Sequence, residues 1–185
     1  MTIQHKSIPD ADLHEVKGAA GALIGKIPIA TGAGTAPFGY ANPIGSISFI
    51  NYAAPYSIVF PTAYTKVSPV TTATGVAVET SEGANARVTY TGALTSKFRI
   101  TCNLSVSQTS GANRDIGIKL YKTGAALAGS EIFQTTTTGV IHLTTTIFDT
   151  VLATNDYIEC YIQNKGASGD VLIHSFVLNF LGLRG

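Results

Sequence analysis

The stretch FRITCNLSV at residues 98–106 alternates without a break between apolar and polar side chains. Successive side chains of an extended chain point to opposite faces, so its five apolar residues share one face and its four polar residues share the other. A strand with this pattern is typically buried on one face and open on the other. Residues 98–106 therefore predict a sheet that packs one face against a core.

Shorter stretches of the same kind fill the rest of the C-terminal part of the chain. From about residue 76 onward, apolar residues recur with a period of two, and a turn signal follows every 8–14 residues or so. Turns are expected at residues 81–85, 122–124 and 155–156, where Gly, Asn or Asp occurs. About eight short strands at this spacing predict an all-β sandwich or jelly roll rather than a parallel α/β fold.

The last run, residues 171–183, is apolar on both faces when it is read with the same period of two. One face carries Val171, Ile173 and Val177, and the other carries Leu172, Phe176, Leu178 and Phe180. A strand that is apolar on both faces is normally covered on both. One face is therefore expected to meet the opposite sheet, and the other to meet something outside the domain.

Charge is scarce and unevenly spread along the chain. Charged residues make up 12% of the sequence and the net charge is +1, whereas globular domains usually carry roughly 25%. This balance argues against a protein that coats nucleic acid. Residues 27–65 hold five prolines and no charge in 39 positions, which excludes a long helix and is unlike a free disordered tail. We expect this segment to lie against its own domain or against a partner, and we divide the chain into an arm at residues 1–65 and a folded domain at residues 66–185.

Residues that could carry chemistry are present, but not in catalytic or metal-binding spacings. The histidines, His5, His14, His142 and His174, have neither H-x-H nor H-E-x-x-H spacing, and the chain has no nucleophile elbow and no P-loop. We therefore expect no catalytic, cofactor-binding or metal-binding residue and no enzyme activity, with a small depolymerase as the enzymatic rival. Cys102 and Cys160 occupy inward positions of their strands and are expected to be buried small hydrophobes, although a disulfide across the sandwich is geometrically possible.

Residues 5–19, HKSIPDADLHEVKGA, resemble a segment near the start of virion proteins of short-tailed phages. Head-decoration, head-fibre and some tail-fibre proteins carry the pattern H-x-x-I-P-D-x-x-L-H-E-P-K-G-A, from which this chain departs at Val16. The resemblance implies an arm that attaches to the virion, with the major capsid protein as its partner. The implied capsid-attachment residues are Ile8, Pro9, Asp10, Leu13, His14, Glu15, Lys17 and Gly18.

Residues 98–107, 116–124 and 156–161 resemble the trimeric jelly-roll modules that are similar to tumour necrosis factor. This resemblance implies an all-β jelly-roll sandwich that follows an extended, mostly irregular N-terminal arm, and it implies a homotrimer. Around a three-fold axis, neighbouring copies would cover the second apolar face of residues 171–183. The residues expected at the trimer interface are Leu172, His174, Phe176, Leu178 and Phe180.

Taken together, these observations predict a structural protein of a bacteriophage virion. The main hypothesis is a trimeric capsid decoration (cement) protein that binds the capsid exterior, stabilises the head and is assembled in the host cytoplasm. The alternative is a tail-fibre or receptor-binding protein that is attached by the same arm and binds a host surface glycan through loops at residues 109–113 and 125–129. Neither hypothesis requires a cofactor, a nucleic acid or a membrane.

Overall fold

A computed structural model describes residues 26–28, 38–40, 43–59, 61–69, 71–76, 79–82, 85–92, 95–166 and 168–183. Among these residues the regular structure consists of β-strands. Contacts divide the chain into two units, residues 1–41 and residues 42–185. In the first unit, β1 (Lys26–Pro28) pairs with β2 (Phe38–Tyr40) in an antiparallel hairpin. The predicted attachment residues lie outside the described residues.

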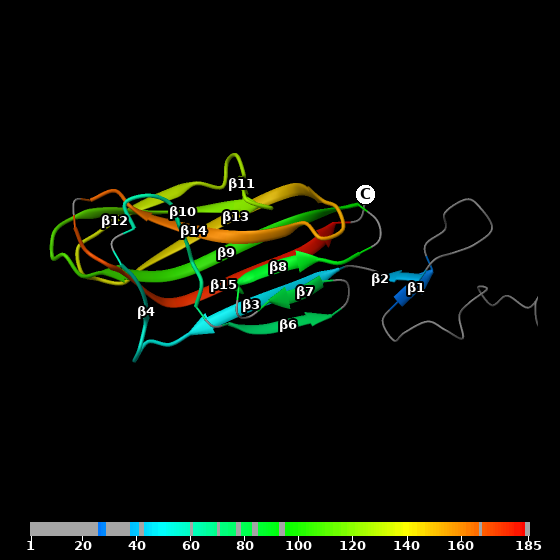
Figure 1. Ribbon diagram of the computed structural model, residues 1–185, viewed down its shortest axis with the longest axis horizontal. Helices are drawn as coiled ribbons and strands as arrows, with labels where there is room; N and C mark the ends of the chain where they lie inside the picture. Colours follow the sequence, from blue (N-terminus) through cyan, green and yellow to red (C-terminus); the bar gives the residue numbers. More distant parts are fainter. Residues whose placement is uncertain are drawn as a thin grey trace, which may run out of the picture. The chain divides into compact units, whose positions relative to one another are not determined.

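The second unit consists of two antiparallel sheets that pack face to face (Figure 1). The first, here called the β9 sheet, has the order β13 (Ile141–Leu152), β9 (Ser96–Gln108), β15 (Val171–Leu183), β3 (Ile44–Ile50) and β6 (Thr72–Val76), with β4 (Tyr56–Ile58) beside β15. The second, the β10 sheet, has the order β11 (Ala125–Ala126), β10 (Arg114–Lys122), β14 (Tyr157–Asn164), β8 (Arg87–Tyr90) and β7 (Glu79–Glu82), with β12 (Ile132–Thr136) beside β10 and β5 (Thr65–Lys66) beside β14.

The chain crosses repeatedly between the two sheets. β9, β13 and β15 of the β9 sheet each follow a strand of the β10 sheet in sequence, namely β8, β12 and β14. Neighbours within the β9 sheet are therefore not consecutive in sequence, as in the double Greek key of a jelly roll. The predicted all-β jelly-roll fold is confirmed.

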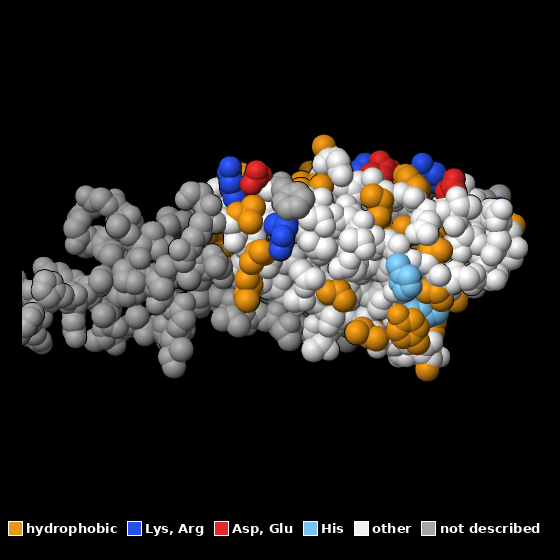
Figure 2. All heavy atoms as spheres, turned by 180° about the vertical axis from the view of Figure 1, so that it is seen from behind, with side chains coloured by type: hydrophobic (Ala, Val, Ile, Leu, Met, Phe, Trp, Pro, Cys, Tyr) orange, Lys and Arg blue, Asp and Glu red, His pale blue; other side chains and the backbone are white. Residues whose placement is uncertain are grey.

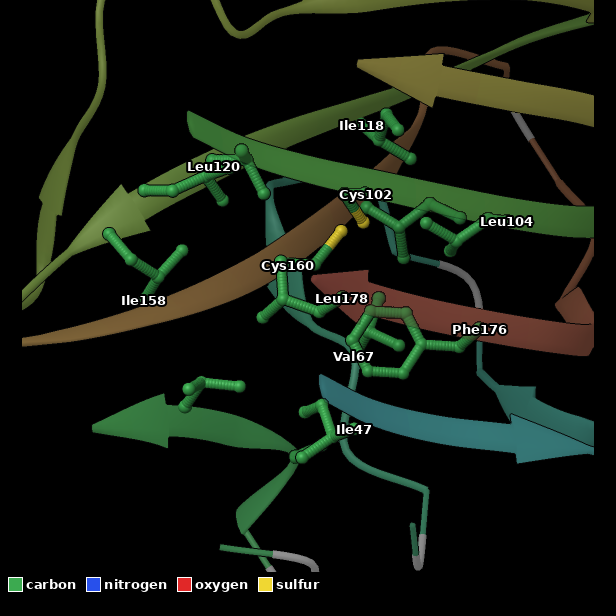
Figure 3. Close-up of a cluster of buried hydrophobic side chains, with 14 of the residues drawn as sticks. Ile47, Val67, Cys102, Leu104, Ile118, Leu120, Ile158, Cys160, Phe176 and Leu178 are labelled. Carbon is green, nitrogen blue, oxygen red and sulfur yellow. The ribbon is translucent and has the colours of Figure 1, made fainter. Parts of the chain in front are cut away.

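The core lies between the sheets and is built by the alternation that the sequence predicted. Phe98, Ile100 and Cys102 of β9 are fully buried and belong to one hydrophobic cluster with residues of the β10 sheet. Figure 3 shows Cys102 in this cluster beside Ile118 and Cys160. The polar residues at the alternate positions of β9 point away from the core. Burial of such apolar faces is the main favourable contribution to the folding of a sandwich.

Two of the predicted turns are set by residues in the left-handed region of backbone space. Thr123 and Gly124 have φ angles of 47° and 81° in the connection between β10 and β11. Asn155, between β13 and β14, has a φ of 70°. Glycine and asparagine tolerate this region better than other residues, so Gly124 and Asn155 suit their positions, whereas Thr123 adopts it although it is β-branched.

The boundary between the two units differs from the predicted one. Residues 44–65 were assigned to the arm, but β3 pairs along its length with β15, and β5, which begins at Thr65, pairs with β14. The division lies after Ala41 instead. The reason is visible in β3, whose sequence IGSISFI alternates as a strand does even though it lies in the uncharged, proline-rich stretch. The function of the N-terminal segment as an attachment arm stays a prediction.

Candidate self-association surface

A β-bulge in β15 decides which of its side chains face outward. Ile173 pairs with Val106 and Ser175 pairs with Ser105, so His174 is an extra residue on β15 with no counterpart on β9. The bulge shifts the alternation by one position, and the apolar residues on either side of it therefore share the core face. These core residues are Val171, Ile173, Phe176, Leu178 and Phe180, none of which is more than 3% exposed.

The predicted trimer-interface residues are separated by this bulge. Leu172 and His174 are half-buried and lie on the outward face of β15. Phe176, Leu178 and Phe180 are buried between the two sheets of their own protomer, where they contact the opposite sheet. The strand is thus not apolar on both faces, because outside the core it presents a mixture of apolar and uncharged polar side chains. Its remaining outward residues are Ser175, Val177, Asn179, Leu181 and Leu183.

Several polar side chains on the outward face of the β9 sheet are paired with one another. Thr144 donates a hydrogen bond from Oγ1 to Oδ1 of Asn103 at 2.8 Å. One row along, the hydroxyls of Thr101 and Thr146 are 3.2 Å apart. These pairs join β13 to β9 at two successive outward positions of the register, with the inward pair of Thr145 and Cys102 between them. A polar group that keeps its hydrogen bond is much less costly to remove from water than an unpaired one, so this face can be covered at a low desolvation cost.

His142 continues this pattern at one end of the face. Its Nδ1 is 2.8 Å from Oγ of Ser105, and Ser175 donates from Oγ to the same Ser105 oxygen at 2.8 Å. Ser105 is only 6% exposed although it points outward. Three strands, β13, β9 and β15, are therefore linked by one chain of hydrogen bonds.

His174 forms a similar pair through one ring nitrogen, but its other ring nitrogen has no hydrogen-bond partner among the described residues. Its Nε2 is 2.9 Å from Oγ of Ser107, and the ring of Tyr52 stacks on it with centroids 5.6 Å apart. Nδ1 of His174 is buried and has no hydrogen-bond partner among the described residues. Tyr52 is 58% exposed, Ile50 at the end of β3 is 68% exposed, and Val59 just after β4 is 79% exposed. This end of the face is therefore apolar and open.

The two sheets differ sharply in charge. The strands of the β9 sheet contain three charged residues, Lys97 and Arg99 on β9 and Asp149 on β13. Its strands β3 and β15 contain none. The strands of the β10 sheet contain nine, which are Lys66, Glu79, Glu82, Arg87, Arg114, Asp115, Lys119, Lys122 and Glu159. Figure 2 shows a broad face of white and orange side chains with pale-blue histidine, with blue and red along its upper edge and at one end.

The outward face of the β10 sheet is a network of tyrosines and ion pairs. The rings of Tyr121 and Tyr161 lie 4.1 Å apart, and Tyr64 donates its hydroxyl to Glu131 at 2.6 Å. Burial, together with the bond to Glu131, raises the pKa of Tyr64 above its usual range. The same bond lowers the pKa of Glu131. Lys66 forms a salt bridge with the nearly buried Glu159. These contacts hold β5 and the segment before it against the sheet.

The two cysteines face each other across the core. Cys102 of β9 and Cys160 of β14 are both free and buried, and Figure 3 shows their sulfur atoms pointing toward one another. Burial, aided by the neighbouring Cys160 thiol, raises the pKa of Cys102, which disfavours the reactive thiolate. The expectation of buried small hydrophobes is confirmed, and the structure contains no disulfide between these two residues.

The described part of the chain shows neither a metal-binding cluster nor a membrane-spanning helix. No group of three or more His, Cys, Asp or Glu residues is placed there to hold a metal ion. No helix in that part is long and apolar enough to span a membrane. The loops at residues 109–113 and 125–129, predicted for glycan contact, are largely exposed. The surface that sequence reasoning missed is the outward face of β13, β9, β15 and β3, whose signal was the adjacent polar pair His174-Ser175 within an apolar run.

Comparison with known proteins defines the fold of the sandwich. Eiger, a tumour necrosis factor from S. frugiperda, superimposes with a TM-score of 0.52 at 11% identity, over 77% of this chain and 93% of that one. Murine APRIL gives a TM-score of 0.46 at 10% identity, over 77% and 99%. The PRD1 vertex protein P5 gives 0.45 at 14% identity, over 77% and 97%. The sequence matches no protein-family model and no curated protein. The superposition with Eiger shows that the chain has a jelly-roll fold similar to that of tumour necrosis factor.

Proposed function

We propose that this chain is a non-enzymatic structural protein of a phage virion that works as a homotrimer, with a capsid decoration (cement) function. Three jelly-roll domains would associate through the outward faces of their β9 sheets. The N-terminal segments would bind the outer surface of the capsid, and the added contacts across capsomers would stabilise the head.

One observation carries the self-association: the outward face of β13, β9, β15 and β3 is uncharged across its middle, and several of its hydroxyls and amides, such as those of Thr144 and Asn103, are already paired. Interfaces between copies of one chain are depleted of charged residues in their core. Apolar side chains such as Val177 and Leu181 lie among the paired hydroxyls and amides. A face of this composition gains from burial while its paired hydroxyls and amides keep their hydrogen bonds.

The virion part of the proposal is supported by the sequence of residues 5–19. Ile8, Pro9 and Leu13 would supply apolar anchors, while Glu15 and Lys17 would supply charged contacts at the edge of the interface. A short segment that becomes ordered on a capsid loses conformational entropy, which burial of these apolar side chains offsets.

Co-sedimentation with capsids that lack the protein tests this attachment. The full chain carrying Ile8→Asp and Leu13→Asp is expected to form normal trimers but to stay in the supernatant. The matched control is Ala11→Asp, which adds a charge at a position outside the shared pattern and is expected to bind as the natural chain does. Wild-type occupancy by the double variant, or by a chain lacking residues 1–26, would rule out the segment as the attachment element.

The tyrosines of the β10 sheet favour a second candidate, a tail-fibre or receptor-binding protein that binds host glycan. Tyr64, Tyr121 and Tyr161 are half-buried neighbours with Lys119 and Glu131 beside them. Aromatic rings next to a few charged groups are typical of small-molecule and sugar sites. Electron microscopy of the virion distinguishes the candidates, because the decoration protein would coat the head and the receptor-binding protein would sit on the tail.

A further inference from the structure

We propose that the self-association of this protein is acid-labile, and that His142 and His174 on the outward face of the β9 sheet are the residues that make it so. This inference rests on the homotrimer of the proposed function. It adds a regulatory property, namely that the copies separate when the medium is acidified from neutral to mildly acidic.

The placement of the two imidazoles is the first step. His142 and His174 lie on β13 and β15, and each is bonded through one ring nitrogen to a serine of β9 that lies between them. Both belong to the face proposed to be buried between copies. A homotrimer would therefore enclose six histidines in one continuous interface.

The second step is the lack of compensating charge around them. Facing His142 are Ser105 of β9 and, beyond it, Ser175 of β15. Facing His174 are Ser107 of β9 and the ring of Tyr52, and β4 places Ser57 beside Leu172. None of these neighbours is an acid.

The charged groups on the packed elements lie further along their strands. Asp170 is four residues before His174, and Asp149 is seven residues after His142. Lys97 and Arg99, at the start of β9, pair in register with Leu183 and Leu181 at the far end of β15. Strands β3 and β4 carry no charge. The nearest groups on these strands are therefore neutral.

The third step is the effect of protonation. A neutral imidazole carries one N–H and one acceptor nitrogen, whereas the imidazolium carries two N–H donors. For His174 the second donor would be the buried Nδ1, which has no acceptor among the described residues. Enclosing several such cations without carboxylates costs free energy that the separated, hydrated copies do not incur. Protons therefore bind preferentially to the separated form and shift the equilibrium toward it.

The experiment measures the dissociation constant of the full chain by analytical ultracentrifugation between about pH 7.5 and about pH 5.5, the range in which histidine changes charge. We expect dissociation to become at least about tenfold easier over this range, with net uptake of protons. A dissociation constant that stays constant, or falls with acid, would overturn the inference and leave the trimer intact. A chain that is monomeric already at pH 7.5 would instead overturn the proposed function.

Variants identify the histidines responsible. The readout is the ratio of the dissociation constants at the two pH values, because this ratio does not depend on how each substitution changes the affinity itself. The double variant His142→Gln/His174→Gln is expected to bring the ratio close to one. His5→Gln, in the N-terminal segment, is the matched control and is expected to keep the full ratio. If the double variant does not associate, the single variants are measured, and each is expected to lower the ratio. An undiminished ratio in the variants would assign the effect to other groups.

Discussion

At the scale of single residues, neighbouring side chains of β15 lie on opposite faces of the β9 sheet, one in the core and the next on the outward face. Phe176 is fully buried in the core between the two sheets. The next residue, Val177, is half-buried on the outward face of the β9 sheet. A substitution at Phe176 therefore reports on folding of the protomer, and one on the outward face reports on association.

Phe176→Ala is expected to lower the free energy of unfolding by about 3–5 kcal/mol, since it removes a buried ring and leaves a cavity. Urea denaturation, followed by circular dichroism at a fixed protein concentration, measures this. Val177→Ala is the matched control and is expected to change protomer stability far less. A loss below about 1 kcal/mol for Phe176→Ala would contradict its placement in the core.

Asp156 ties the turn before β14 to the rest of the sheet. Partial burial opposes ionisation, but the backbone N–H of Ala153, the Lys122 ammonium and the Thr123 hydroxyl together lower the pKa of its carboxyl. The distance from Nζ of Lys122 to Oδ2 of Asp156 is 2.9 Å. Because the pKa is lower in the folded chain, the ionised carboxylate contributes stability above its unfolded pKa, and this contribution is lost as the pH falls through the folded value.

Asp156→Asn is therefore expected to cost about 0.5–1 kcal/mol at neutral pH and clearly less at about pH 2, because the stability that a carboxylate of lowered pKa contributes is progressively lost below its unfolded pKa. Unfolding free energies at the two pH values check this. This range lies well below the one in which histidine titrates, so the turn does not confuse the association experiment. An equal cost at both pH values would show that the charge of Asp156 is not what stabilises the turn.

At the scale of elements, the bulge at His174 reconciles the sequence of β15 with a one-sided core. Removing a residue from a regular strand moves every later side chain to the opposite face. Removing the extra residue of a bulge instead restores regular pairing. With His174 absent, Ile173 and Phe176 would still both point inward, because Ser175 alone would separate them.

Deletion of His174 is accordingly expected to leave a folded protomer, whereas deletion of Val177 is expected to unfold it by turning Leu178 and Phe180 outward. Thermal denaturation monitored by circular dichroism compares the two chains, which have equal length. Two equally unstable deletions would contradict the bulge assignment.

The elements also show what the sequence could predict. The strand at residues 98–106 was predicted correctly because one of its faces is buried and the other is not, which leaves a clean period of two. β3 was missed because its short alternation lies in an uncharged, proline-containing stretch that we interpreted by composition. The bulge was missed because a strict period assigns Phe176 and Val177 to faces that a one-residue shift exchanges.

The candidate surface depended on the same shift. Leu172 and His174 were predicted for the interface and do lie on the outward face, whereas Phe176, Leu178 and Phe180 do not. The serines that bond His142 and His174 are some 37 and 67 residues away along the chain. Only the pairing of β13, β9 and β15 brings these groups together, so no local sequence pattern predicts the histidine–serine hydrogen bonds.

At the scale of the whole molecule, the asymmetry between the two sheets is the central observation. One outward face carries ion pairs and tyrosines, and the other carries paired hydroxyls, amides and imidazoles without charge across its middle. The charged face is suited to solvent and the uncharged one to contact with further copies. Self-association through the β9 sheet is therefore the central claim.

The most direct test of this claim is the molar mass in solution of the full chain and of Asn179→Asp, measured by light scattering at about 10 µM and neutral pH. Asn179 is half-buried on the outward face of β15, and the substitution keeps its shape while adding a charge that burial between copies would strongly disfavour. Asn113→Asp makes the same chemical change in an exposed loop and serves as the control. We predict a trimer, three times the chain mass of 19.3 kDa, for the natural chain and the control, and a folded monomer for Asn179→Asp. A monomeric natural chain, or an Asn179→Asp trimer as stable as the control, would contradict the account.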